Sequence, residues 1–138
     1  MNQKLNCILL IDDDEIANYI NSSVVKHVDC CETVVTVQSG KAALDYLTTE
    51  EDGNYPQPDL IFLDINMPGM NGWEFLEHYQ KLKKSQQGKI IVVMLTSSVN
   101  PDDVEKARSM REVSEFKTKP MTEEMLKEVI NENFGFES

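Results

Sequence analysis

The run CILLIDDDE, from Cys7 to Glu15, joins five apolar residues directly to four acidic ones. An apolar run without alternation is typical of a strand buried on both faces of a parallel sheet. The acids that follow suit the positive end of a helix, and Asp14 is of the type that caps a helix N-terminus. This stretch therefore predicts a strand, a short turn and a helix, which is the opening unit of an α/β domain.

The same order of elements is repeated along the rest of the chain, as short apolar runs alternate with stretches of helical periodicity. Strict alternation with short connections favours right-handed crossovers. We predict an α/β fold, a doubly wound sheet of five parallel strands in the flavodoxin-like order 2-1-3-4-5 with five helices. The predicted strands are Cys7–Ile11, Thr33–Val37, Leu60–Leu63, Ile90–Leu95 and a weaker one around Phe116, and the predicted helices are Ile16–His27, Lys41–Thr48, Trp73–Lys84, Asp102–Met110 and Glu123–Glu132.

Three further helix starts carry local signals. Asn71 with Glu74 three residues later forms a capping-box pattern. Asn100 precedes Pro101, which has no N–H to leave unpaired in a first helical turn. Thr122 precedes two acidic residues that suit the helix dipole. These signals support the predicted order of elements.

The composition is that of one ordinary globular domain: 138 residues, of which 41% are hydrophobic and 27% charged. Thirteen basic and 24 acidic residues give a net charge of −11. Such a charge repels nucleic-acid backbones and anionic membranes. We therefore expect no direct contact with nucleic acid or with a membrane, and a single domain over residues 1–138 with no output domain.

No apolar run approaches the roughly 20 residues that cross a bilayer, and Met1–Asn6 begins no secretory signal. The three cysteines, Cys7, Cys30 and Cys31, lack the spacing of a zinc site. We expect them to be reduced, structural thiols in a cytoplasmic protein.

Polar residues follow the predicted strands at the edge where ligands of such sheets gather. Asp12 and Asp13 follow the first strand, Asp64 the third, Thr96 the fourth and Lys119 the fifth. If the first and third strands are neighbours, three carboxylates share one crevice and repel one another. Either some of them stay protonated or a cation neutralises them, and hard oxygen ligands favour Mg²⁺.

A carboxylate can also act as a nucleophile and form an aspartyl phosphate. The Lys119 ammonium and the Thr96 hydroxyl would then meet the phosphoryl oxygens. Each residue alone also admits a local role, as a helix start, a turn residue or a solvated charge. A haloacid-dehalogenase-type phosphatase needs an aspartate where Asn66 stands, and the acids after the first strand would repel the phosphate of a flavodoxin's flavin.

Four motifs, in this order and spacing, resemble those of the receiver domains of two-component response regulators, of which the single-domain chemotaxis regulator is the type example. They are Ile8–Glu15, Asp59–Gly72, Leu95–Ser97 and Lys119–Pro120, and together they cover nearly the whole chain.

The resemblance implies that Asp64 is the phosphoacceptor. It implies that Asp12 and Asp13 bind Mg²⁺ directly or through water, together with Asp64 and the Asn66 backbone carbonyl. Asn66 and Ser98 fall where the family tunes the rate of its autodephosphorylation.

The resemblance also implies a switch. Thr96 matches the switch hydroxyl, Lys119 the phosphate-binding lysine, and Phe116 the aromatic switch residue. The Lys119–Pro120 bond matches one that is usually cis in the family.

By this resemblance, the chain accepts a phosphoryl group from a histidine kinase or a histidine phosphotransfer protein and catalyses only its own phosphotransfer and autodephosphorylation. The output is then contact with a downstream protein, or dimerisation, through the face of Asp102–Met110, the strand around Phe116 and Glu123–Glu132. Two alternatives remain: a phosphorelay intermediate or phosphate sink, and a protein-binding module that works without phosphorylation.

Two segments depart from the type example. Arg111–Glu115 lacks the glycine and alanine that the family often has at the end of this helix, so the helix is expected to end differently. The loop Glu50–Pro58 is longer, and in this it is similar to stand-alone receivers that include phytochrome-associated ones.

Overall fold

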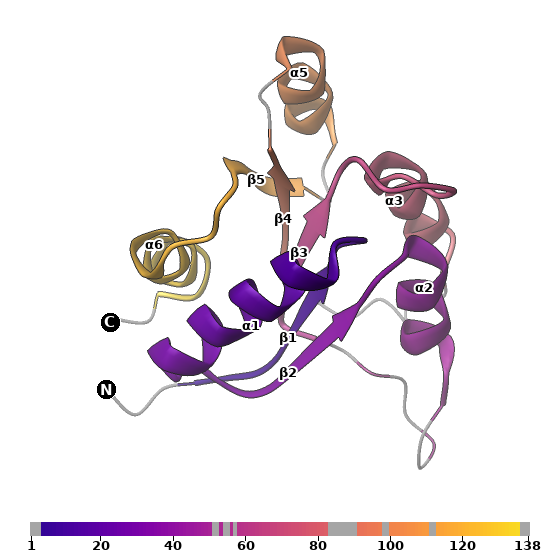
Figure 1. Cartoon of the computed structure of the whole chain (residues 1–138). Helices are drawn as coiled ribbons and strands as arrows, with labels where there is room; N and C mark the ends of the chain where they lie inside the picture. Colours follow the sequence, from indigo (N-terminus) through magenta and orange to yellow (C-terminus); the bar gives the residue numbers. More distant parts are fainter. Residues whose placement is uncertain are drawn as a thin grey trace.

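A computed structural model describes residues 4–50, 53, 56, 58–82, 91–97, 100–110 and 113–135. Strands and helices alternate along the chain, as predicted (Figure 1). The elements are β1 (Leu5–Ile11), α1 (Glu15–Val28), β2 (Cys31–Val37), α2 (Gly40–Thr48), β3 (Leu60–Asp64), α3 (Gly72–Gln80), β4 (Ile91–Thr96), α5 (Pro101–Ser109), β5 (Val113–Thr118) and α6 (Glu123–Phe134).

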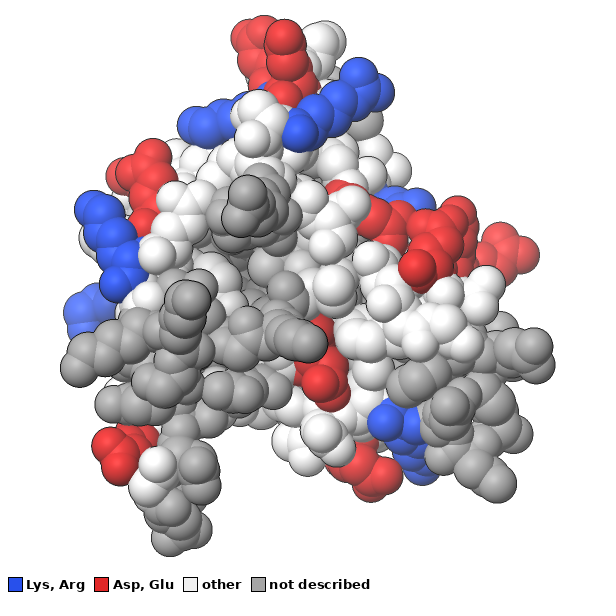
Figure 2. All heavy atoms as spheres, turned by 180° about the vertical axis from the view of Figure 1, so that it is seen from behind, with Lys and Arg blue, Asp and Glu red and all other residues white. Residues whose placement is uncertain are grey.

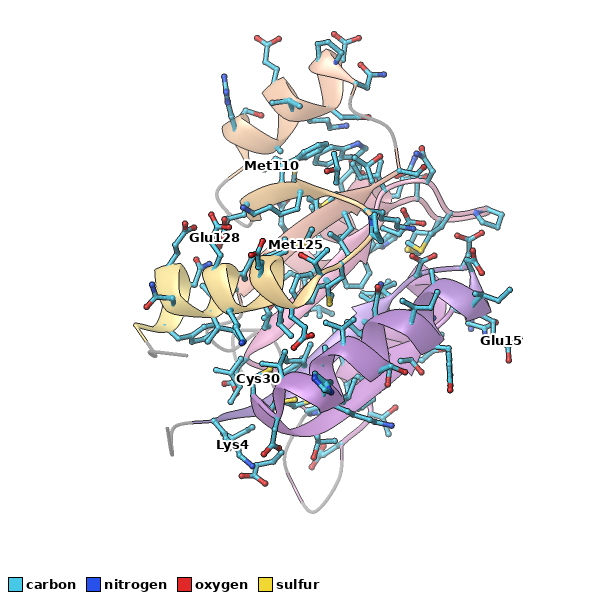
Figure 3. The ribbon with its side chains drawn as sticks, turned by 60° about the vertical axis from the view of Figure 1, so that its left-hand side comes forward. Lys4, Glu15, Cys30, Met110, Met125 and Glu128 are labelled. Atoms are coloured by element: carbon cyan, nitrogen blue, oxygen red, sulfur yellow. The ribbon has the colours of Figure 1, made fainter. Side chains whose placement is uncertain are left out.

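The five strands form one parallel sheet in the order β2-β1-β3-β4-β5, which confirms the predicted fold. The central strand register places Ile11 beside Leu63 and Asp64 beside Leu95. The polar residues at the carboxyl ends of β1, β3 and β4 therefore meet at one edge of the sheet. Figure 3 shows Glu15 at this end of α1, whereas Cys30 and Lys4 lie near the other end.

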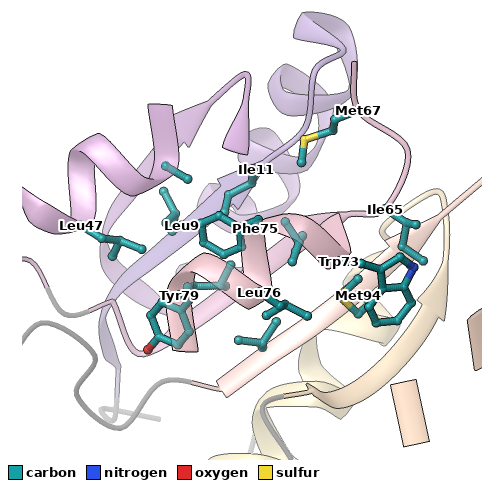
Figure 4. Close-up of a cluster of buried hydrophobic side chains, with 14 of the residues drawn as sticks. Leu9, Ile11, Leu47, Ile65, Met67, Trp73, Phe75, Leu76, Tyr79 and Met94 are labelled. Atoms are coloured by element: carbon teal, nitrogen blue, oxygen red, sulfur yellow. The ribbon is translucent and has the colours of Figure 1, made fainter. Parts of the chain in front are cut away.

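The sheet is covered on both faces, which explains why its central strands are apolar throughout. On one face, Leu9 and Ile61 pack with the inner sides of α2 and α3 (Figure 4). On the other face, Leu10 and Phe62 pack with α1 and α6. Successive strand residues point to opposite faces, so each central strand contributes to both clusters.

The predicted helix starts are confirmed by their caps. Asp14 accepts a hydrogen bond from the Ile16 N–H at 2.9 Å, and Thr122 accepts one from the Met125 N–H at 3.1 Å. Asn71 forms the capping box with Glu74, as the sequence pattern indicates. These caps place the first turns of α1, α3 and α6.

The predicted helix Trp73–Lys84 is wrong at its C-terminal end, because α3 stops at Gln80. The Lys81 N–H donates to the carbonyls of His78 and Tyr79, which is a tightening of the last turn. Residues 83 and 84 lie outside the described residues, as does Ile90, the predicted first residue of the fourth strand.

The cysteines Cys7, Cys30 and Cys31 are free, as predicted, and each is half-buried. Among the described residues, no helix has the length and apolar character needed to cross a membrane.

Candidate functional site

Three carboxylates meet at the carboxyl edge of the sheet. Asp12 and Asp13 follow β1, and Asp64 ends β3. One carboxylate oxygen from each lies within 4.8 Å of the others. Asp12 and Asp64 are buried, with 3% and 5% of their surface exposed, whereas Asp13 is exposed. The predicted acidic crevice is therefore present, with two acids in its floor and one at its rim.

Lys119 enters this pocket from the end of β5. Its Nζ lies 2.5 Å from Asp12 Oδ2 and 3.4 Å from Asp64 Oδ1. The Lys119 N–H donates to the Thr96 carbonyl at 2.7 Å, and the Lys119–Pro120 peptide bond is cis, as expected. The ammonium thus lies beside both buried carboxylates.

The buried charges change one another's ionisation. Burial, and then the neighbouring Asp12 carboxylate, raise the pKa of Asp64 to about 6, although Lys119 acts in the opposite direction. Burial lowers the pKa of Lys119, but the carboxylates of Asp12 and Asp64 outweigh this and raise it overall. At neutral pH, Asp64 is therefore mostly ionised and Lys119 carries its charge.

The donor chemistry of the pocket fits a hard divalent cation. Three carboxylates and one ammonium leave a formal charge of −2 when all are ionised. Oxygen ligands without sulfur or nitrogen are those that Mg²⁺ prefers. A cation here would remove the repulsion between Asp12 and Asp64 that raises the pKa of Asp64.

Thr96 is buried at the end of β4, with 1% of its surface exposed, one residue beyond Leu95, which pairs with Asp64. Phe116 lies on β5, where it pairs with Met94 of β4, and it is half-buried against the core. Phe116 also lines a groove of about 650 Å³ between α5 and β5.

Asn66 is exposed in the turn after β3. Ser98 lies outside the described residues, as do Arg111 and Glu112. The helix before this segment ends at Ser109 with Met110 as its cap in extended conformation, not in the left-handed conformation that favours glycine.

Asn18 is a residue of the site that sequence reasoning missed. Its side-chain amide donates to the carbonyls of Asp12, at 2.8 Å, and Val37, at 3.1 Å. The Asp14 N–H donates to Asp12 Oδ1 at 2.9 Å, so the acidic loop is held from both sides. The available signal was a polar residue on the inner face of α1, one helical turn after the Asp14 cap.

The family model described as the response regulator receiver domain matches residues 8–131. The probable methanogenesis regulatory protein FilR2 of Methanothrix harundinacea is 32% identical over 126 residues, which are 91% of this chain and 79% of that protein. The response regulator Rcp1 of Synechocystis is 34% identical over 98 residues, which are 70% of this chain and 65% of Rcp1.

Solved structures show the same fold. A two-component response regulator from Cytophaga hutchinsonii is 33% identical, with a TM-score of 0.83 over 97% of this chain and 100% of that one. The bacteriophytochrome response regulator RtBRR is 30% identical, with a TM-score of 0.78 over 97% of this chain and 81% of that one. With its acidic pocket of Asp12, Asp13 and Asp64 beside Lys119, the chain belongs to the response regulator receiver domain family.

Proposed function

We propose that this receiver accepts a phosphoryl group from a phosphohistidine onto Asp64, and that phosphorylation changes the protein-binding properties of the face formed by α5, β5 and α6. The observation that carries the proposal is the pocket itself. Asp64 is buried beside two further acids and a lysine whose Nζ lies 3.4 Å from its carboxylate. Because receiver domains take phosphoryl groups from histidine kinases, a histidine kinase or a histidine phosphotransfer protein is the proposed donor.

In the proposed step, an ionised Asp64 oxygen attacks phosphorus, an O–P bond forms and the P–N bond to the donor histidine breaks. The electron pair of the broken bond stays on the imidazole nitrogen, which takes a proton from water. With a pKa of about 6, Asp64 is available as the carboxylate at neutral pH. Lys119 is already placed within reach of a group on Asp64 and keeps its charge.

Asp12, Asp13, Asp64 and the backbone carbonyl of Asn66 would hold Mg²⁺ in this proposal. When bound, the ion supplies positive charge that offsets the repulsion between the pocket and the incoming phosphoryl group. Asn18 and the Asp14 N–H keep the loop of Asp12 in place for this task.

The proposed switch uses Thr96, the last residue of β4, and Phe116 on β5. The phosphoryl group brings a charge of about −1.5 to −2, in place of the single negative charge of the ionised Asp64 carboxylate. The Thr96 hydroxyl would donate to it, and Phe116 would move in response, which alters the face beside the groove between α5 and β5.

An apolar patch beside the pocket supports docking of the donor. Ile16, Tyr19 and Ile20 are 69%, 74% and 47% exposed. Their spacing places them on one face of α1, immediately after the loop of Asp12 and Asp13. A phosphohistidine that reaches the recessed Asp64 brings the surface of its own protein close to this patch, so we propose that the donor covers it.

The likeness to the bacteriophytochrome response regulator RtBRR supports the subclass expected from the longer loop Glu50–Pro58, although most of this loop lies outside the described residues.

The proposal is tested by incubation with acetyl phosphate and Mg²⁺, followed by intact mass. We expect the wild type to gain the mass of one phosphoryl group, and Asp64→Asn and the chelator-treated wild type to gain none. Asp45→Asn, which makes the same change at an exposed position of α2, is the control and should be phosphorylated normally. Equal uptake by Asp64→Asn would contradict the proposal.

Mixing the phosphorylated chain with a histidine phosphotransfer protein then separates two roles. Passage of the phosphoryl group to that protein identifies a relay intermediate. Retention of a downstream partner by the phosphorylated form alone identifies a switch, and equal retention by Asp64→Asn identifies a module that works without phosphorylation.

A further inference from the structure

Helix α5 is weakly attached to the rest of the domain by apolar packing. Of its nine residues, only Ala107 is buried. Figure 1 shows α5 standing apart from the other helices. A groove of about 650 Å³, lined among others by Val104, Ala107 and Phe116, separates it from β5. Burial of one methyl group contributes little to the free energy of docking, so other contacts must hold this helix.

Two such contacts are made with one indole ring. The Trp73 Nε1–H donates to Asp103 Oδ1 at 3.1 Å. The Lys106 Nζ lies over the same ring, 5.0 Å from its centroid, in a cation–π contact. Asp103 and Lys106 are three residues apart on α5 and therefore project from the same face of the helix, so both contact the ring.

Trp73 is itself fixed to the loop that follows Asp64. Its ring is buried, with 7% of its surface exposed, in the cluster that also contains Ile65 and Met94 (Figure 4). The preceding Gly72 donates its N–H to the Ile65 carbonyl at 2.8 Å. Gly72 also lies so close to β3 that a Cβ there would be 2.7 Å from the Asp64 carbonyl oxygen. A shift of the backbone at Asp64 therefore displaces Trp73.

The second connection to α5 is short. Only residues 97–100 separate Thr96, at the end of β4, from Pro101, the first residue of α5. Asp103 lies in the first turn of α5. Its contact with Trp73 therefore joins α5 to α3 at the N-terminal end of α5, the end that is connected to β4. The position of α5 thus depends on two parts of the site: the loop after Asp64, through Trp73, and the end of β4, through Thr96.

We infer that Trp73 is a positioning residue that links the phosphorylation site to α5, through its hydrogen bond to Asp103 and its cation–π contact with Lys106. The inference rests on the proposed function for the event that is transmitted. It names a route to the proposed binding face that starts at the loop after Asp64 and runs through the start of α3. This route is separate from the one through Thr96 and Phe116.

The test compares amide hydrogen exchange of α5 in matched variants. Asp103→Leu removes the acceptor of the indole N–H, whereas Asp102→Leu removes an acid from the same helical turn without touching the ring. The loss of charge near the helix dipole is then equal in both. We expect α5 amides to exchange about fivefold faster, or more, in Asp103→Leu than in Asp102→Leu. Asp103→Asn, which keeps an acceptor oxygen, should restore slow exchange.

The emission of Trp73 provides a second readout, because it is the one tryptophan of the chain. Its spectrum should change in Asp103→Leu and in Lys106→Met. It should stay as in the wild type in Asp102→Leu and in Arg108→Met, which removes a positive charge from the same helix without touching the ring.

Phosphorylation with acetyl phosphate, measured by intact mass, then tests transmission. In the wild type we expect the exchange of α5 amides to change about fivefold or more. In Asp103→Leu phosphorylated to the same extent, this change should fall by at least about half. An undiminished response in Asp103→Leu, or equal exchange in unphosphorylated Asp103→Leu and Asp102→Leu, would overturn the inference.

Failure of the proposed function would be visible separately. If the wild type gains no phosphoryl mass, the proposed function is wrong. The proposed transmission from Asp64 to α5 is then wrong as well. The comparison of unphosphorylated variants still decides whether Trp73 holds α5.

Discussion

The domain contains two groups of acids that each surround one lysine, and the two lysines are only two residues apart. In the pocket, Lys119 contacts Asp12 and Asp64, whose side chains are 4% and 7% exposed. On the surface, the Lys117 Nζ lies 3.4 Å from Glu115 Oε1 and 3.8 Å from Glu128 Oε1. The side chains of these two glutamates are 15% and 56% exposed. Figure 2 shows acidic side chains gathered on the side of α6.

The two groups have similar numbers of acids. The difference between them therefore shows that the ionisation of the pocket acids depends on their burial and rigidity. Burial of Asp64, and then repulsion from the neighbouring Asp12 carboxylate, raise the pKa of Asp64 to about 6. The glutamate of α6, with its longer side chain, can move into solvent, where water screens its charge. The same residue chemistry therefore gives a reactive site at one place and an ordinary charged surface at the other.

Removal of each lysine should give the largest contrast. Lys119→Met leaves two buried carboxylates without their partner, and breaking a buried pair is strongly destabilising. We expect the free energy of unfolding at pH 7 to fall by about 3 kcal/mol in Lys119→Met and by less than about 1 kcal/mol in Lys117→Met. Urea denaturation measures both values. Equal losses would show that the two groups do not differ in their electrostatics.

Neutralisation of Asp64 should stabilise the fold when no divalent cation is present. Because the pKa of Asp64 is raised from 3.8 to about 6, the folded state binds more protons than the unfolded chain between these pH values. The free energy of unfolding of the wild type therefore falls as the pH rises through this window. We expect Asp64→Asn to be more stable by about 2 kcal/mol at pH 7.

The pH dependence of that difference is the check. The advantage of Asp64→Asn should disappear as the pH is lowered toward 4 and should stay constant above about pH 7. Urea denaturation in chelator at several pH values measures it. An advantage that is independent of pH would mean that the burial of charge at Asp64 is not its cause.

Mg²⁺ should stabilise the pocket and leave the surface group unaffected. An ion that binds only the folded state at ten times its dissociation constant adds about 1.4 kcal/mol. We expect this gain in the wild type and in Glu115→Gln, and a much smaller one in Asp13→Asn. Asp13 is exposed at the pocket rim, so its replacement removes a ligand without opening the core. Thermal unfolding with increasing Mg²⁺ measures the gain, and equal gains in all three proteins would contradict a metal site at Asp13.

The smallest effect should come from the surface group itself. Glu128→Gln removes a contact of 3.8 Å between the Lys117 Nζ and a glutamate whose side chain is 56% exposed. We expect the free energy of unfolding to change by no more than about 0.5 kcal/mol. A larger loss in urea denaturation would show that the surface group is held more rigidly than its exposure indicates.

Much of the fold and pocket could be predicted because each feature has a local signal. The apolar runs mark the strands, and the first polar residue after the first, third and fourth runs marks the strand end, which is how Asp12, Asp64 and Thr96 were found. Lys119 lies three residues after Phe116 of the weaker fifth strand. A parallel sheet then brings these ends to one edge, so no distance information was needed to expect a shared crevice.

The rest depends on contacts between residues far apart in the sequence, which leave a weak local signal or none. Trp73 and Asp103 are 30 residues apart, and nothing in either helix indicates that they meet. The sequence shows Asn18 only as a polar residue of the first helix. Its hydrogen bonds to the carbonyls of Asp12 and Val37 are seen only in the folded structure. The end of α3 at Gln80 was also missed, because the chain beyond it has neither a glycine nor a proline to stop the helix nearby.

The central claim is that the pocket directs phosphoryl transfer to Asp64 and to no other acid. Borohydride reduces an aspartyl phosphate to homoserine, so peptide mass spectrometry of the reduced protein identifies the modified residue after reaction with acetyl phosphate and Mg²⁺. The account predicts homoserine at Asp64 alone, and none when a chelator replaces Mg²⁺. Homoserine at Asp12 or Asp13, at the surface acids, or at Asp64 to the same extent in chelator would contradict it.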